Sequence, residues 1–174
     1  MVSKLVDIRE GLGTTFISML CSEEKLVMST YILIRYLHFL GIFVWIGTLV
    51  AEWTLLQPEL PRRTIKRLIK IDRVYGVSAI VVVAMGLLMW LGVGKPAEYY
   101  SNNPLFILKV TLAIIVGLLS IYPTRFFSRQ RKGEDLDTMI VIPSRVRQLV
   151  LAQLLTMIVI PLLATLMAAG VGLN

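Results

Sequence analysis

The chain has 174 residues, of which 56% are hydrophobic and only 17% charged, and its mean hydropathy is +0.76. Ordinary soluble domains carry about a quarter charged residues, so this composition argues against a soluble fold. One cysteine and one histidine exclude a disulfide framework within the chain and any metal or iron–sulfur site built from several of either residue.

Two long stretches without a charged residue indicate an integral membrane protein. Residues 74–94 and 148–174 carry no charge, and about 20 apolar residues cross a bilayer core as a helix. We predict an all-α membrane protein, with an antiparallel bundle of four transmembrane helices over residues 29–174 and an interfacial amphipathic helix over residues 1–28. The predicted spans are residues 29–52, 74–94, 103–123 and 148–171.

Three local patterns add detail in chain order. In residues 4–20 apolar side chains recur at helical spacing with charged residues on the other face, which predicts a surface anchor. The basic amphipathic stretch 61–72 suits the anionic cytoplasmic leaflet. Asn103 followed by Pro104 predicts a helix N-cap at the start of the third span.

The basic residues predict the orientation. Loops 53–73 and 125–147 hold six lysines and arginines each, 12 of the 18 in the chain. By the positive-inside rule both loops are cytoplasmic and both termini face outward. We therefore predict a multi-pass protein of the bacterial inner membrane whose immediate partner is the lipid bilayer.

Several titratable residues interrupt the spans, and each costs about 2.5–3.5 kcal/mol on insertion scales. Arg35 lies near an outer helix end and can snorkel, whereas Glu52 at the inner end is expected to form an ion pair near Arg73. His38 and Lys109 lie deeper, about 13 Å and 8 Å from the outer end at 1.5 Å per residue. Two helices can thus present them to one buried ligand. Alternatively, Lys109 snorkels outward and His38 bonds a neighbouring carbonyl.

Small residues accompany the histidine. Gly41 shares a helix face with His38 and Trp45, and Gly86 lies at similar depth on the second span. This pattern is typical of close helix packing, but it also leaves room for a flat macrocycle. Haem b fits the latter interpretation. His38 and Lys109 would then be ligands of the haem iron, and Arg35 would pair with the propionates.

The same residues carry a resemblance to known families. LHFLGIFVWIGTLVAE, RRTIKRLIKIDRVYG and LFILKVTLAII resemble the first three helices of bacterial membrane-bound, haem-binding protoporphyrinogen oxidases. With SIYPT, they more closely resemble a bacterial family of four-helix membrane proteins, a domain of unknown function, akin also to copper-resistance D-type proteins. The resemblance implies haem binding through His38 and Lys109. It does not imply the oxidase reaction, because no histidine closes the third helix.

Three functions remain open at this point. The first is a b-type haem protein of redox function, oxidising a porphyrinogen or another small reductant and passing electrons to a quinone or a partner. The second is a copper-handling protein in which His38, Met85 and Met89 supply soft ligands. The third is a non-catalytic subunit or assembly factor, and the small-residue faces also suit a homo-oligomer or a larger membrane complex. Nucleic acid binding is rejected because the basic residues are spread over two short loops beside membrane ends, with few interleaved aromatic residues.

Overall fold

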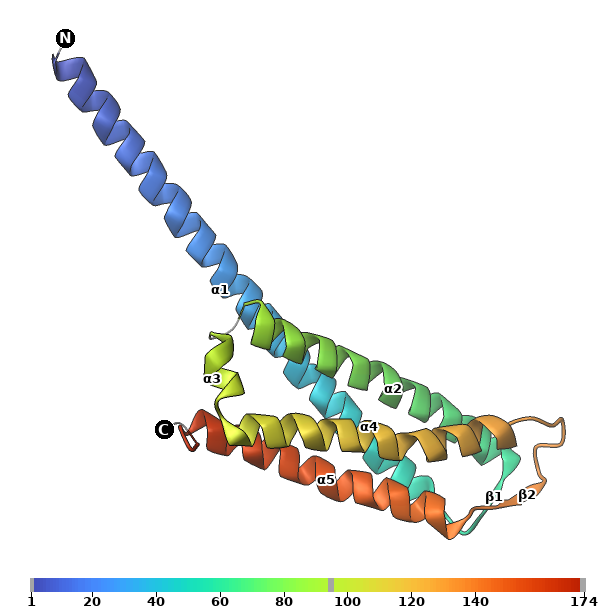
Figure 1. Cartoon of the computed structure of the whole chain (residues 1–174). Coiled ribbons are helices and arrows are strands. Elements are labelled where there is room, and N and C mark those ends of the chain that lie inside the picture. The colour runs from blue at the N-terminus through green and yellow to red at the C-terminus, as the bar shows by residue number, and fades with distance from the viewer. Residues whose placement is uncertain (1, 94–95, 173–174) are drawn as a thin grey trace.

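The structure, a computed structural model, describes the backbone of residues 2–93 and 96–172 and the side chains of residues 22–93 and 96–172. Four long helices form a bundle (Figure 1). They are α1 (Val2–Leu55), α2 (Arg62–Leu91), α4 (Pro104–Gln130) and α5 (Ser144–Ala168). Each contains a stretch long and apolar enough to cross a membrane. The predicted all-α bundle of four membrane-spanning helices is confirmed.

The helices extend beyond the predicted spans at the loop end of the bundle. α2 begins at Arg62, so the basic stretch 61–72 is the first part of a membrane helix and not a separate surface segment. α4 continues through Pro123 to Gln130. Lysine and arginine are good helix formers. Their charges keep these residues outside the hydrocarbon core of the bilayer, but the helices continue through them.

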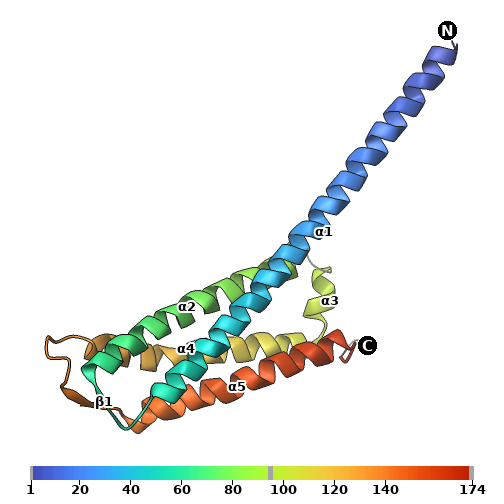
Figure 2. The ribbon, with the colours of Figure 1, turned by 180° about the vertical axis from the view of Figure 1, so that it is seen from behind.

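The N-terminal segment also differs from the prediction. Residues expected to form a separate helix over 1–28 and a span over 29–52 belong to one helix, α1, from Val2 onward. Figures 1 and 2 show its N-terminal part projecting away from the bundle. At 1.5 Å per residue, 54 residues extend about 81 Å, against about 30 Å of hydrocarbon. The side chains of the expected surface anchor over 4–20 lie outside the described residues.

The two basic loops meet in a small sheet that the sequence did not predict. β1 (Glu59–Pro61) and β2 (Met139–Val141) pair antiparallel, with Leu60 opposite Ile140. The Arg62 guanidinium donates a hydrogen bond to the backbone carbonyl of Asp135 at 2.6 Å. Because β1 precedes α2 and β2 precedes α5, this ladder joins the α1–α2 hairpin to the α4–α5 hairpin.

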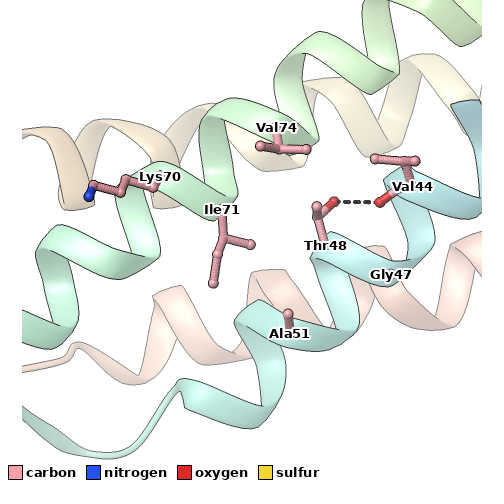
Figure 3. A pocket seen from close by; sticks show the side chains of 7 residues that line it. All are labelled: Val44, Gly47, Thr48, Ala51, Lys70, Ile71 and Val74. Carbon is pink, nitrogen blue, oxygen red and sulfur yellow. Dashed lines mark hydrogen bonds between the residues drawn. The ribbon is translucent and has the colours of Figure 1, made fainter.

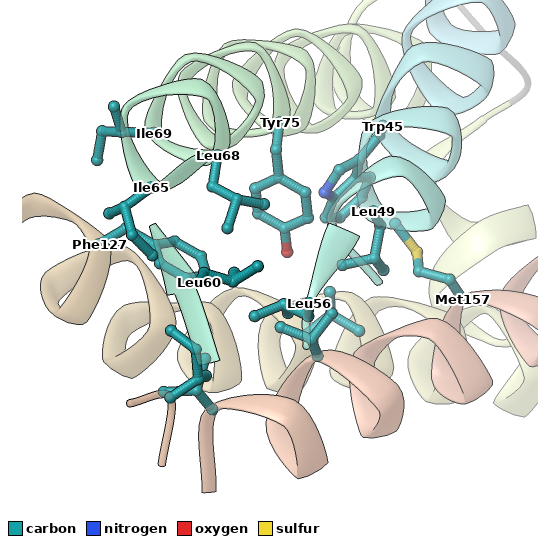
Figure 4. Close-up of a cluster of buried hydrophobic side chains, with 14 of the residues drawn as sticks. Trp45, Leu49, Leu56, Leu60, Ile65, Leu68, Ile69, Tyr75, Phe127 and Met157 are labelled. Atoms are coloured by element: carbon teal, nitrogen blue, oxygen red, sulfur yellow. The ribbon is translucent and has the colours of Figure 1, made fainter. Parts of the chain in front are cut away.

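The buried core lies in the half of the bundle nearer the strands. Its members come from all four long helices and both strands, and Figure 4 shows many of them. They are Trp45, Leu49, Leu56, Leu60, Ile65, Leu68, Ile69, Tyr75, Val82, Val116, Phe127, Ile140, Ile142, Val146, Val150 and Met157.

The opposite end of the bundle is held differently. A short helix, α3 (Ala97–Ser101), precedes α4 there. The Asn103 side chain accepts a hydrogen bond from the Leu105 N–H at 2.9 Å, with Pro104 as the first helical residue. This confirms the predicted N-cap. Asn103 also donates to the Val171 carbonyl at 3.2 Å, which ties the start of α4 to the end of the chain beyond α5.

Candidate functional site

His38 forms a hydrogen bond across the α1–α2 contact, which confirms the alternative prediction that it bonds a neighbouring carbonyl. Its Nδ1 lies 2.9 Å from the backbone carbonyl oxygen of Val82 on α2. A carbonyl oxygen only accepts, so in the neutral ring Nδ1 carries the proton and Nε2 keeps its lone pair. Histidines that bind metals are commonly held in this way, with one ring N–H donated to a carbonyl and the other nitrogen free to ligate.

The two glycines near His38 make close helix packing possible. A Cβ atom on Gly41 would lie 2.8 Å from Cγ2 of Val82, and one on Gly86 would lie 3.3 Å from Cε1 of His38. Both spaces are therefore occupied by side chains of the neighbouring helix. Of the two interpretations of these glycines, the structure favours packing: Gly41 lets α1 and α2 approach, and Gly86 accommodates the imidazole.

Lys109 lies on a different helix from His38. It is half-buried on α4 with its Nζ 5.2 Å from the ring centre of Phe106, and its charge acts on the imidazole. Arg35 is exposed one turn outward from His38, with its guanidinium carbon 5.8 Å from the ring centre of Phe39. That His38 and Lys109 share one ligand stays a prediction.

Trp45 belongs to a second group of residues, nearer the strands. It is 4% exposed, and its ring meets that of Tyr75 edge-on at 5.9 Å between centres. Around this pair lie polar side chains from all four long helices, which we call the inner polar cluster. Its members are Trp45, Glu52, Asp72, Tyr75, Thr124 and Gln153.

Hydrogen bonds connect part of the inner polar cluster. The Tyr75 hydroxyl donates to Oε1 of Gln153 at 2.8 Å, joining α2 to α5. The Thr124 hydroxyl donates to Oδ1 of Asp72 at 2.8 Å, joining α4 to α2. Within the described residues, Oε1 of Glu52 and Nε1 of Trp45 are buried without a hydrogen-bond partner. The cluster therefore holds some polar groups that are hydrogen-bonded and others that are not.

The environment of Glu52 differs from the prediction. An ion pair near Arg73 was expected, but the charged group that acts on Glu52 is the carboxyl of Asp72. Arg73 is exposed, whereas Glu52 is only 3% exposed. The reason is helical geometry: Asp72 and Arg73 are consecutive on α2, and consecutive residues on a helix point about 100° apart. Asp72 faces the bundle, so Arg73 does not.

Two open grooves lie beside the helices. One, of about 420 Å³ between α2 and α4, reaches the inner polar cluster. It is lined by Asp72, Arg73, Tyr75, Gly76, Ser120, Ile121, Thr124 and Arg125. The other, of about 450 Å³, lies between α1 and α2 and is almost wholly apolar (Figure 3). Gly47, Ala51 and Val74 are among its lining residues, so it suits lipid chains rather than a polar ligand.

Comparison with known proteins places the chain in a family. None of the curated proteins, and none of the solved structures, is similar enough to count as a relative. A family described as "Predicted membrane protein (DUF2214)" matches residues 30–172, which hold most of the first candidate span and all of the other three. The protein therefore belongs to this family of membrane proteins.

Proposed function

We propose that this protein is a b-type haem protein of the membrane, in which His38 would be a ligand of the haem iron. The observation that carries the proposal is the hydrogen bond from Nδ1 of His38 to the Val82 carbonyl. It leaves the Nε2 lone pair free and fixes the ring plane, which is what an iron ligand requires.

Lys109 and Arg35 supply the other contacts that a haem needs. Lys109 lies on α4, and its amine would be a second ligand of the iron or would balance a propionate charge. Arg35, exposed one turn outward, is placed for a propionate at the membrane surface. A bound haem supplies one-electron redox chemistry. A porphyrinogen or another small reductant as electron donor, and a quinone as acceptor, are extensions of this proposal suggested by the resemblance to the oxidases.

The absorption spectrum of the purified protein tests the proposal. We expect protein from haem-replete cells, purified in mild detergent, to show a Soret band with about one haem per chain. His38→Ala should abolish the band. Phe43→Ala, which removes a ring of 71% exposure from the same helix, should leave it intact and serves as the matched control. Lys109→Met should move the band if the amine binds iron.

Other outcomes would refute the haem proposal. Colourless wild-type protein from haem-replete cells would do so, as would a band that persists in a well-folded His38→Ala variant. Stoichiometric copper in place of iron would favour the copper-handling alternative, with Met85 and Met89 as the next residues to change. Protein that carries neither metal but co-purifies with a larger complex would favour the non-catalytic subunit.

We also propose the orientation that the basic loops predict. α1 projects from the end of the bundle at which α5 ends, and the β1–β2 sheet lies at the opposite end (Figures 1 and 2). The positive-inside rule places the sheet in the cytoplasm and the termini outside the inner membrane. Reporter domains fused to the C-terminus and inserted after Gly133 should be active on opposite sides. Both on one side would refute this topology.

A further inference from the structure

The inner polar cluster holds two carboxyl groups without a basic partner. Glu52 is 3% exposed and Asp72 is 6% exposed, and each lies in a membrane-spanning helix. The Asp72 carboxyl acts electrostatically on Glu52, and both act on Tyr75. In the described part of the chain, neither carboxyl forms an ion pair with a lysine or arginine. Two such charges repel each other and have lost most of their hydration, so the cluster favours an added positive charge.

The remaining basic groups near this end of the bundle do not supply that charge. On α2 and α4, Arg73 and Arg125 line the groove but are exposed. α5 contributes Gln153, which does not titrate, and its Arg147 lies six residues, about 9 Å, nearer the strands. The carboxyls therefore need a cation from outside the chain.

The surroundings of Glu52 indicate which cation this is. Within the described residues, Oε1 of Glu52 is buried without a hydrogen-bond partner, whereas the Trp45 indole turns its Nε1 toward Tyr75 (Figure 4). Among the described residues, no group of three or more histidines, cysteines or acidic residues could hold a metal. A proton neutralises a single carboxyl and needs no further ligand.

We propose that Glu52 and Asp72 form an exchangeable proton-binding site inside the membrane, reached from the strand end through the groove beside Asp72. Asp72 lines the groove between α2 and α4, from which a proton would reach it, and its carboxyl acts electrostatically on Glu52 of α1. The step is a simple protonation, in which a carboxylate oxygen takes up H⁺ and releases it again. The Thr124 hydroxyl, which donates to Oδ1 of Asp72 at 2.8 Å, orients that carboxyl for this exchange.

This proposal does not depend on haem binding. His38 and Glu52 are 14 residues apart on α1, about 21 Å at 1.5 Å per residue. Loss of haem in a His38 variant would leave the proton site unchanged. Conversely, a carboxyl variant with a normal Soret band would show that the two sites are separate.

Infrared spectroscopy of the purified full chain in liposomes tests the proton site. At neutral pH we expect the carbonyl stretch of a protonated carboxylic acid, shifting downward after exchange into D₂O. Glu52→Gln should remove this band. Glu59→Gln is the matched control because Glu59 is an exposed acid in β1. Gly76→Leu should slow the exchange several-fold, because Gly76 lines the groove and a Cβ there meets no atom within 4 Å.

Three results would overturn the proposal. The first is the absence of any protonated carboxyl band in the wild-type protein between pH 6 and pH 8. The second is a band that survives in both Glu52→Gln and Asp72→Asn; testing both variants also covers the case in which one fails to fold. The third is thermal stabilisation by Na⁺ relative to choline at constant pH that disappears in Glu52→Gln, which would assign a metal cation to the cluster.

Discussion

Replacing Gly41 with alanine perturbs the contact on which the orientation of His38 depends. The new Cβ would lie 2.8 Å from Cγ2 of Val82, whereas carbon atoms pack best at about 3.5–4.0 Å. Valine is β-branched and keeps one strongly preferred rotamer in a helix, so Cγ2 cannot swing away cheaply. The helices must separate instead, and Val82 is the residue whose carbonyl holds the imidazole.

The size of the effect follows from a matched pair of variants. Alanine in place of a mid-helix glycine stabilises a helix by roughly 0.5–1 kcal/mol. Gly47→Ala should show only this gain, because a Cβ at Gly47 meets no atom within 4 Å. Gly41→Ala has the same gain but adds overpacking, which costs about 1–3 kcal/mol. Both variants share the gain in helix stability. The difference between their free energies of unfolding therefore measures the cost of the overlap with Val82, about 1–3 kcal/mol.

The measurement is the free energy of unfolding in mixed micelles, followed by tryptophan fluorescence during titration with SDS. Val82→Ala removes Cγ2, so Gly41→Ala should cost less in that background, as a double-mutant cycle reports. Equal stability of Gly41→Ala and Gly47→Ala, together with no coupling to Val82→Ala, would refute the packing argument and the orientation of His38 derived from it.

Three further predictions concern other parts of the bundle. Tyr75→Phe should destabilise the protein by about 1–3 kcal/mol in the same assay because it leaves buried Oε1 of Gln153 without a donor, whereas Tyr122→Phe at an exposed site should be neutral. Asn103→Ala should cost about 0.5–2 kcal/mol through loss of the α4 cap, and an unchanged stability relative to Asn102→Ala would contradict it. Hydrogen bonds from the Thr138 hydroxyl and the Asp137 N–H lower the pKa of Asp135. The ionised Asp135 therefore orders its loop above the ordinary aspartate pKa, and the loop loses this order as the pH falls through the lowered pKa of Asp135. Relative to the intrinsic exchange rate at the same pH, the amides of residues 133–138 should lose protection in that acid range. Asp135→Ala should show this loss of protection already at neutral pH.

The sequence predicts the membrane bundle well because charge-free runs such as 74–94 have a direct physical meaning in lipid. It predicts helix ends less well. The basic residues from Arg62 onward were assigned to a loop, although a helix tolerates them outside the hydrocarbon. The β1–β2 pairing was missed because strands of three residues carry no periodic signal.

The candidate sites also include one part that the sequence predicts and one part that it does not. His38 and Lys109 could be found from sequence because a lone titratable residue within an apolar run is conspicuous. The inner polar cluster could not, since Asp72 was assigned to a loop and Gln153 is uncharged. The available signal was the spacing of Asp72 and Tyr75, three residues apart and so on one helix face. Their proximity to Glu52 depends on how α1 packs against α2, which a single sequence does not state.

The ladder between β1 and β2 has a mechanical consequence for the whole molecule. It fastens the two helical hairpins at one end, where most of the buried core also lies. At the far end, the hairpins are linked by α3 and the segment around it. Trp90 near the end of α2 also donates to the Ser101 hydroxyl at 3.3 Å, and its ring lies 5.0 Å from that of Phe106 on α4. The two hairpins are thus held by a few contacts at this end and by the ladder and the buried core at the other. A force that separates the hairpins would therefore open the end beside α3 before the end beside the sheet.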